Sequence, residues 1–423
     1  MSGGLLTDLY ELNMAVSYLR RGMTGPATFS LFVRDLPPDR GFLIAAGLED
    51  CLAFLADFSF TPDDLAWLAD AQGFGDQDLA ALRELRFTGE VWAVPEGTAV
   101  FAGEPLVEVT APAAEAQLAE TVLLNHVTVQ TSIATKAARC VLAAGGAQLV
   151  DFSFRRTQGI EAGLAAARTS AIAGFAATSN TEAARRYGLP AAGTMAHSFI
   201  EAFGSEEQAF TAFAEDFPGK TTFLVDTYDT AEGIQTAIQV ARTLGLPGPV
   251  AIRLDSGDLG ALAVTARRLL DDAGLPDARI FASGGLDEYA IAALVSRGAP
   301  IDAYGIGTKM GTSADAPYLD SAYKLTEFGG RPVMKLSQGK ATLPGTKQVH
   351  RGPDGDLLAL RDEPPPPGHQ PLLAQVMRHG ARLHPAEPLA TPGTAAHTPW
   401  PGYPARHGCC APRRPYRSPS ARH

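Results

Sequence analysis

The sequence predicts an α/β protein made of an irregular α/β barrel and a smaller mixed α/β domain that both chain ends form. Between residues 148 and 308, short apolar runs alternate with helical stretches, which is typical of parallel βα units. The stretch 87–110 switches to a period of two, and 323–350 returns to short strands that are expected to join the same small sheet. The predicted parts are 1–112 completed by 326–384, the barrel at 113–325, and a disordered tail at 385–423.

Composition favours a folded, soluble chain. The 423 residues are 46% hydrophobic and 19% charged, which is a globular profile and not a disordered one. The formal net charge of -11 argues against general binding to nucleic acid or to anionic membranes. No uncharged apolar run approaches the ~20 residues that span a bilayer, and the start lacks the basic stretch of a signal peptide. We therefore expect a cytoplasmic protein with neither nucleic acid nor membrane as a partner.

The elements before the βα region can be placed by apolar spacing. A helix is expected over residues 5–21 with Thr7 as its cap, followed by a strand over 27–33 and a second helix over 42–54. An alanine-rich stretch, 113–144, predicts a long helix that ends at a pair of glycines. These elements give the barrel its flanking domain and its first helix.

The barrel strands are the short apolar runs of the central region. Because no G-x-G-x-x-G motif opens the series, a dinucleotide-binding sheet is disfavoured, and a closed or irregular barrel fits better. The runs 174–177 and 191–193 are weaker strand candidates. The stronger ones are 148–152, 222–225, 250–254, 279–282 and 301–304.

Polar and glycine residues follow these strands, where barrel enzymes carry their functional groups. The carboxyl ends of parallel strands meet at one rim, so the loops after them are expected to lie together. Glycine turns after the last two strands suit a phosphate held by backbone N–H groups. The loops predict a site for a phosphorylated sugar with a cation-assisted leaving group, and they cover 151–156, 226–229, 253–258, 283–285 and 305–308.

His197 lies in the glycine- and alanine-rich run 193–199 and is the candidate reactive side chain. Imidazole titrates near neutral pH and is a competent nucleophile. A buried structural histidine is the alternative reading of this residue alone, and His126 is interpreted in that way.

Cysteine usage predicts neither a disulfide nor a metal cage. Cys51 and Cys140 lie in separate apolar helical patterns, as reduced core residues do. Cys409 and Cys410 are adjacent in the tail, without a second pair to complete a metal site.

Separated motifs across residues 4 to 350 closely resemble the nicotinate phosphoribosyltransferase family. They are T-D-L-Y at 7–10, D-F-S-F-R-R-T-Q-G at 151–159, G-T-M-A-H-S-F at 193–199, R-L-D-S-G-D at 253–258, G-I-G-T-K at 305–309, S-A-Y-K-L at 321–325 and P-G-T-K-Q-V at 344–349. The resemblance implies formation of nicotinate mononucleotide from nicotinate and phosphoribosyl pyrophosphate. It also implies coupling to ATP hydrolysis through a phosphohistidine, a requirement for Mg²⁺, and a homodimer with shared active sites. No P-loop motif occurs, so ATP would use the same pocket.

The same resemblance assigns roles by position. His197 would accept phosphate from ATP, and Asp226 would hold the imidazole in one tautomer. Phe152 and the partner subunit's Tyr10 would sandwich the pyridine ring. Mg²⁺ would be held by the substrate phosphates. The remaining implied substrate-binding residues are Arg155 and Thr194 at the carboxylate or adjoining phosphate, Arg253 and Asp255 at the ribose and its phosphates, Gly284, Gly285, Gly305, Gly307 and Thr308 at the 5′-phosphate, and Asn180, Ser198 and Ser283 beside them.

Two alternatives stay open. A nicotinamide-using relative is disfavoured by Leu9, which replaces a serine, and by Asn180, which replaces an aspartate and can donate to a carboxylate. The second alternative is a family member without catalytic activity that acts as a binding or scaffold protein. Without the resemblance, Tyr10 and Phe152 would each be interpreted as aromatic residues of the core. The acidic residues would be interpreted as helix caps: Asp226, Asp255 and Asp258. Ser153 and Phe154 depart from the family pattern of glycine and leucine.

Overall fold

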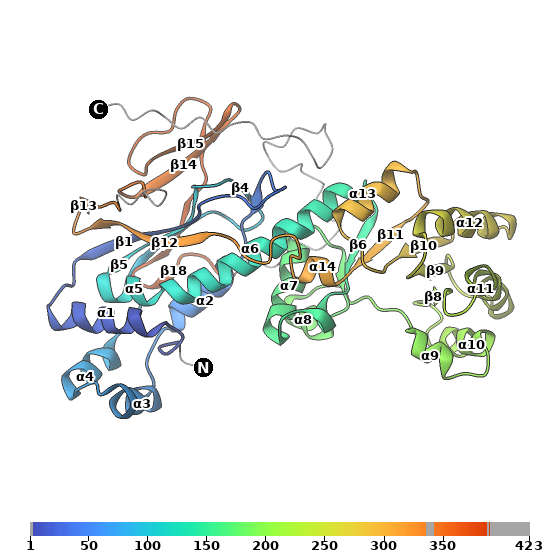
Figure 1. The fold of residues 1–423 in the computed structure, drawn as a ribbon, viewed down its shortest axis with the longest axis horizontal. Coiled ribbons are helices and arrows are strands. Elements are labelled where there is room, and N and C mark those ends of the chain that lie inside the picture. The colour runs from blue at the N-terminus through green and yellow to red at the C-terminus, as the bar shows by residue number, and fades with distance from the viewer. Residues whose placement is uncertain (1–2, 336–341, 387–388, 390–423) are drawn as a thin grey trace. The chain divides into compact units, whose positions relative to one another are not determined.

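The computed structural model describes residues 3–335, 342–386 and 389, and it divides the chain into two compact units (Figure 1). One unit contains the chain up to Ser132 together with the C-terminal region from Tyr318, and the other contains Ile133–Pro317. The two boundaries lie inside the barrel range that the sequence predicted, 113–325.

The first unit, like the prediction, mixes helices with mostly antiparallel strands. Its helices are α1 (Leu9–Arg20), α2 (Leu48–Asp57), α3 (Pro62–Gln72), α4 (Asp76–Glu84) and α5 (Ala113–Leu118), and α6 (Glu120–Ala143) begins in it. Its strands are β1 (Pro26–Val33), β2 (Leu43–Ile44), β3 (Glu90–Ala93), β4 (Ala99–Val100), β5 (Pro105–Pro112), β12 (Ser321–Phe328), β13 (Arg331–Pro332), β14 (Lys347–Gly352), β15 (Gly355–Leu360), β16 (Gln370–Pro371), β17 (Ala374–Arg378) and β18 (Ala381–Arg382).

A seven-stranded sheet draws its strands from both ends of the chain. Its order is β13-β12-β1-β5-β3-β17-β18, and the pairs are antiparallel. The blue β1 lies between β5 and the orange β12 (Figure 1), with Leu31 opposite Val107 and Tyr323. This sheet is complete only when both chain ends are present, as the sequence predicted for β12, whereas β14 pairs with β15 and β16 in a separate sheet.

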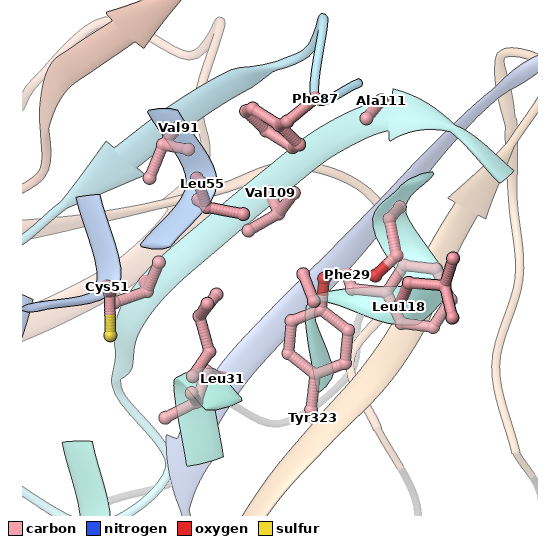
Figure 2. Packing of buried hydrophobic residues seen from close by; sticks show 14 of the residues in the cluster. Phe29, Leu31, Cys51, Leu55, Phe87, Val91, Val109, Ala111, Leu118 and Tyr323 are labelled. Atoms are coloured by element: carbon pink, nitrogen blue, oxygen red, sulfur yellow. Dashed lines mark hydrogen bonds between the residues drawn. The ribbon is translucent and has the colours of Figure 1, made fainter. Parts of the chain in front are cut away.

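Apolar side chains from the sheet and the helices form the core of the first unit (Figure 2). Phe29 stacks on Tyr323 with ring centroids 4.7 Å apart, and the Tyr323 hydroxyl donates to the carbonyl of Ala116. Burying aromatic rings of this size contributes strongly to stability. Cys51 lies in this core as a buried free thiol, and Cys140 is likewise a free buried thiol of the second unit.

The second unit is a parallel α/β arrangement. Its strands are β6 (Gln148–Asp151), β7 (Ala177–Thr178), β8 (Phe223–Leu224), β9 (Ala251–Leu254), β10 (Arg279–Ala282) and β11 (Ala303–Ile306). Its helices are the short η1 (Phe154–Arg156), α7 (Ile160–Ile172), α8 (Thr181–Tyr187), α9 (His197–Glu201), α10 (Glu206–Asp216), α11 (Thr230–Leu244), α12 (Leu259–Asp272), α13 (Glu288–Ser296) and α14 (Thr308–Gly311).

These six strands pair in parallel in the order β7-β6-β11-β10-β9-β8. The α/β class and the parallel sheet are therefore confirmed. In the described part of the chain no ladder joins β7 to β8, so pairing does not close the barrel. The weak candidate at 191–193 is reduced to an isolated bridge between Ala191 and Thr178.

Several element boundaries differ from the predictions for local reasons. The first helix begins at Leu9 with Asp8 at its N-cap, and Thr7 instead donates to Glu11 over 2.6 Å. The helix expected over 42–54 is a two-residue strand followed by α2, because Gly47 between them has φ 96. A Cβ there would lie 2.7 Å from the His126 carbonyl oxygen, so only glycine fits. The stretch 113–144 forms α5 and α6, and most of the tail predicted to be disordered lies outside the described residues.

Candidate active site

The carboxyl ends of the parallel strands bring the predicted site loops together within the second unit. The backbone N–H of Phe152, after β6, donates to Ile306 at the end of β11 over 2.8 Å. The N–H of Ser283, after β10, donates to Leu254 at the end of β9 over 2.8 Å. Because neighbouring strands end at the same level, the loops after β6, β11, β10, β9 and β8 follow one another along one rim.

Arg253, at the end of β9, contacts its own loop, the loop after β10 and the segment that precedes α9. Its Nε donates to Ser283 Oγ over 2.7 Å, one terminal nitrogen donates to Thr194 Oγ1 over 2.7 Å, and the other to Asp255 Oδ1 over 2.7 Å. The residue is only 9% exposed. A buried guanidinium needs such partners to offset its desolvation. Arg253 therefore fixes the relative positions of the loops that carry Thr194, Asp255 and Ser283.

Asp255 is held as a carboxylate by this arrangement. Burial by itself would raise its pKa, but hydrogen bonds from Ser283 and Arg253 and the charge of Arg253 outweigh burial, so the pKa lies below its usual value. Oδ1 accepts from both Ser283 and Arg253. Oδ2 faces the imidazole of His197, with Nε2 3.9 Å away. The site thus contains a fixed negative charge beside its histidine.

His197 is the first residue of α9 and is part-exposed. Its Nδ1 lies 3.1 Å from Thr227 Oγ1, in the loop after β8. A hydroxyl can donate to or accept from a ring nitrogen, so Thr227 can hold the imidazole in orientation. Nδ1 is engaged by Thr227 and Nε2 faces Asp255, so the ring is held in the site while part of it stays exposed to solvent.

Asp226 takes a different place from the one expected. Its Oδ2 accepts from the backbone N–H of Asp255 over 2.9 Å and from Ser256 Oγ over 2.7 Å. Its Oδ1 is buried and has no hydrogen-bond partner among the described residues. The structure thus pairs the His197 ring with Thr227, whereas Asp226 braces the turn that carries Asp255. The cap alternative applies to Asp258, which caps α12, and not to Asp226.

The aromatic ring of Phe152 lies beside the guanidinium of Arg253. The Arg253 guanidinium carbon lies 5.5 Å from the Phe152 ring centroid, and Phe281 packs at 5.6 Å on the ring. A Cβ on Gly305 would come within 2.7 Å of the Phe152 ring and 2.9 Å of Phe281. Glycine at 305 thus leaves room for this aromatic ring at the end of β6.

Two glycine turns follow β10 and β11. Gly284 has φ 99, and a Cβ there would lie 2.0 Å from the Asp255 carbonyl oxygen, so no other residue fits. Gly285 also has positive φ, at 62. Gly307 precedes Thr308, the first residue of the short α14, and a Cβ on Gly307 would approach the Phe152 carbonyl at 3.3 Å. Both turns hold their backbone close to the strand ends.

The other predicted residues divide by environment. Arg155 and Ser198 are exposed, so their donors face solvent. Asn180 is fully buried, caps α8 through Oδ1, and donates from Nδ2 to the Gly163 carbonyl over 3.3 Å. Asn180 thus has a structural role here, and its contact with substrate stays a prediction. Tyr10 belongs to the first unit and is 51% exposed.

Sequence reasoning missed three residues of the site region: Thr227, Lys309 and Glu206. Lys309 stands beside Thr308 inside the motif 305–309, and Thr227 stands beside Asp226 in the predicted site loop 226–229, although neither residue was assigned a role. Glu206, the first residue of α10, has no local signal. Burial and the charges of Glu232, Asp226 and Asp229 raise its pKa to about 7.

Glu206→Gln is expected to stabilise the protein at alkaline pH. The folded-state pKa of Glu206, about 7, exceeds the ordinary value of 4.5, so the folded protein binds this proton more tightly than the unfolded chain. The loss of folding stability caused by ionisation of Glu206 is absent below pH ~4.5. It grows between the unfolded-state and folded-state pKa values and is complete above pH about 7. Since the side chain is part-exposed, we expect a modest rise in Tm of roughly 2–4 °C at pH 8. Thermal melts should show this gain vanish at pH 4, and a pH-independent gain would contradict the assignment.

No helix within the described ranges is both long and apolar enough to cross a bilayer. Among the same residues, no group of three or more histidine, cysteine or acidic side chains gathers as a metal site.

Comparison with known proteins places these features in a family. Residues 5–128 match the nicotinate phosphoribosyltransferase N-terminal domain, and residues 133–320 match the quinolinate phosphoribosyl transferase C-terminal domain. A nicotinate phosphoribosyltransferase of Mycobacterium tuberculosis is 49% identical over 387 residues, which cover 90% of this chain and 83% of that protein. The chain belongs to the nicotinate phosphoribosyltransferase family.

A second relative agrees in sequence, and two solved structures agree in fold. The nicotinate phosphoribosyltransferase of Bacillus subtilis is 44% identical over 375 residues, covering 85% of this chain and 76% of that one. The crystal structure of human nicotinic acid phosphoribosyltransferase superposes with a TM-score of 0.80 at 31% identity, covering 92% of each chain. A nicotinate-nucleotide pyrophosphorylase from Pyrococcus furiosus, 24% identical with a TM-score of 0.74, shares the fold. The family resemblance seen in the sequence is therefore confirmed.

Proposed function

We propose that this protein is a nicotinate phosphoribosyltransferase that makes nicotinate mononucleotide and pyrophosphate from nicotinate and phosphoribosyl pyrophosphate, a step of NAD biosynthesis. The observation that carries the proposal is the Arg253, Asp255 and Ser283 cluster beside His197, next to two glycine turns on the same rim. Family membership supports it, because the relatives from bacteria and human carry this activity in their names. With two buried free thiols and no membrane-spanning helix in the described ranges, a cytoplasmic location is part of the proposal.

Nicotinate would lie against the Phe152 ring, which presents an aromatic face beside Arg253. The exposed Arg155 and the hydroxyl of Thr194 would bind its carboxylate or the adjoining phosphate, since a guanidinium donates two parallel hydrogen bonds. Tyr10 of a second copy would cover the other face in a homodimer. Exposed apolar residues in α1 and just before it support that contact: Leu6, Leu9, Tyr10 and Met14.

The chain's groups suit displacement at C1 of the sugar. The pyridine nitrogen would attack C1 with its lone pair as the bond from C1 to the pyrophosphate oxygen breaks, so no protein nucleophile is needed there. Asp255 would bind the ribose hydroxyls as a carboxylate. The turns at Gly284–Gly285 and Gly305–Thr308 would hold the 5′-phosphate through backbone N–H groups. Charge builds on the leaving pyrophosphate, so cationic groups such as Arg155 favour the transition state.

Mg²⁺ is part of the proposal as a substrate-bound ion. Mg²⁺ commonly uses one or two carboxylates together with substrate phosphates. The buried Oδ1 of Asp226, without a partner among the described residues, fits such a ligand. When bound, the ion would neutralise charge on the pyrophosphate.

ATP coupling through His197 completes the proposal. Nε2 would attack the γ-phosphorus of ATP as the bond to the β–γ bridging oxygen breaks, releasing ADP and leaving a phosphohistidine that water later hydrolyses. Thr227 would keep the ring oriented through Nδ1 during this exchange. ATP would enter the same pocket, because the sequence has no P-loop motif.

An assay of the purified protein tests the function. Nicotinate, phosphoribosyl pyrophosphate and Mg²⁺ are mixed with and without ATP, and mononucleotide formation is followed. We expect nicotinate mononucleotide in both mixtures and more of it with ATP. Equal use of nicotinamide would favour the nicotinamide-specific alternative. No product under either condition would leave the catalytically silent binding protein as the better reading.

A further inference from the structure

An ion pair bridges the two glycine turns that are proposed to hold the 5′-phosphate. Lys309 follows Gly307 and Thr308 at the start of α14, and Asp287 follows Ser283–Gly285 at the start of α13. The Lys309 ammonium lies 2.8 Å from Asp287 Oδ2. The pair therefore links the turn after β10 to the turn after β11, two neighbouring strands.

Asp287 uses its two carboxylate oxygens for different purposes. Oδ1 accepts from the backbone N–H of Ala290 over 2.9 Å and caps α13, while Oδ2 faces Lys309. The carboxylate is 14% exposed and the lysine 45% exposed. Burial by itself would raise the pKa of Asp287, but the hydrogen bond from Lys309 and the capping bond outweigh it, so the pKa lies below its usual value. The capping role and the bridging role can therefore be separated by substitution.

Behind the turns, a buried network holds the same two helices to α6. Glu288, the residue after Asp287, is fully buried and accepts ion pairs from Lys136 at 2.6 Å and Arg139 at 3.0 Å. The same two cations pair with Asp315, which follows α14, at 2.8 Å and 3.4 Å. The two cations thus pair with Glu288 in the interior, as buried charges require, and with the more exposed Asp315 at its edge. This network fixes the start of α13 and the chain after α14 to one helix.

We infer that Lys309 is a positioning residue for the sugar-phosphate cradle, acting through Asp287 to set the spacing of the two glycine turns. This inference rests on the proposed function, in which both turns bind one 5′-phosphate. The buried network fixes both helices from the side of α6, and the Lys309–Asp287 pair fixes their starts at the turns themselves. Backbone N–H groups bind a phosphate well only when their positions are set beforehand. Lys309 is not assigned a contact with the phosphate, because its ammonium is engaged by Asp287.

The test is a double-mutant cycle on the full chain. Asp287→Asn keeps an oxygen for capping α13, since asparagine caps as well as aspartate, but loses the charge that faces Lys309. Lys309→Met removes the cation from the other side. Each is expected to raise the Kd of ribose 5-phosphate, measured by calorimetry, and the KM of phosphoribosyl pyrophosphate about fivefold, with the KM of nicotinate unchanged. The double variant is expected to show about fivefold as well, because both changes break one interaction.

Asp258→Asn is the matched control. Asp258 also caps a helix, α12, through Oδ1 and places Oδ2 3.5 Å from a cation, Arg297. It is expected to leave ribose 5-phosphate binding unchanged. Lys309→Arg should restore most of the affinity, which a nonspecific loss of folding would not allow.

The outcomes separate the inference from the proposed function. Single variants that bind ribose 5-phosphate like the wild type overturn the inference while the function stands. Additive losses, or a loss for Lys309→Met without one for Asp287→Asn, also overturn it and make Lys309 a direct phosphate ligand. A wild-type protein that binds ribose 5-phosphate but forms no mononucleotide overturns the function, and the binding cycle still decides the role of the pair. A wild-type protein that forms mononucleotide without binding ribose 5-phosphate leaves the function standing. The KM of phosphoribosyl pyrophosphate then decides the role of the pair.

Discussion

Arg253→Met is expected to lower kcat/KM for nicotinate mononucleotide formation about 10²–10³-fold, as the loss of one preorganised donor does in other sites. Methionine has a similar reach but cannot donate to Thr194, Asp255 and Ser283, which come from three different loops. Steady-state kinetics in saturating ATP measures this change. We expect kcat to fall and the KM of phosphoribosyl pyrophosphate to rise, because the loops of the site are no longer held in place before the substrate binds.

The pH profile of this variant gives a second readout. In the wild type, hydrogen bonds from Ser283 and Arg253 hold the pKa of Asp255 below its usual value. Loss of Arg253 raises that pKa, so the acid limb of the kcat/KM profile is expected to move to higher pH. Arg185→Met is the control, since Arg185 is exposed and pairs with the nearby Glu182 on α8. A variant with nearly normal activity and an unmoved acid limb would contradict the central role of Arg253.

His197→Ala is expected to abolish ATP hydrolysis and the stimulation by ATP, while some ATP-independent transfer remains. The imidazole is the proposed phosphoryl acceptor, whereas attack at C1 needs only the pyridine nitrogen. Incubation with γ-labelled ATP should give an acid-labile, alkali-stable protein label in the wild type and none in the variant. Undiminished ATP hydrolysis in this variant would show that another residue accepts the phosphate.

Two further substitutions test which residue orients the His197 ring. Thr227→Val removes the hydroxyl 3.1 Å from Nδ1 and is expected to reduce ATP hydrolysis about 10–100-fold, the usual cost of losing an orienting partner. Asp226→Asn tests the orientation role that the family resemblance implies for Asp226. A loss in Asp226→Asn with normal Thr227→Val would reverse the assignment that the geometry favours.

The sequence predicted which residues line the rim because a parallel sheet imposes that order. Asp255 follows β9, Ser283 follows β10 and Gly307 follows β11, and each strand was visible as a short apolar run. The carboxyl ends of parallel strands share one edge, so the residues that follow them must come together whatever their exact contacts. The return to short strands after residue 323 predicted that both chain ends share one sheet, and β1 does lie between β5 and β12.

Local sequence does not decide between two neighbouring residues that could take the same role. Asp226 and Thr227 are adjacent, and either could face an imidazole, but the turn after β9 attracts the Asp226 carboxylate through the Asp255 N–H and Ser256. The sequence predicts a substrate contact for Asn180, and the structure adds a capping role at the start of α8 that the sequence analysis did not assign. The break between β2 and α2 depends on the backbone of α6 at His126, which no local pattern reveals.

By itself, then, the sequence determined the α/β class, the family and the loops that carry the functional groups, because apolar spacing and motif positions give the places of the strands along the chain. Only the tertiary structure decided which side chains pair: Thr227 with His197, Arg253 with three loops, and Lys309 with Asp287. Hydrogen bonds depend on side-chain torsions and on packing between segments that are far apart in the chain. A shift of one ångström changes a partner, whereas it leaves the order of the strands intact.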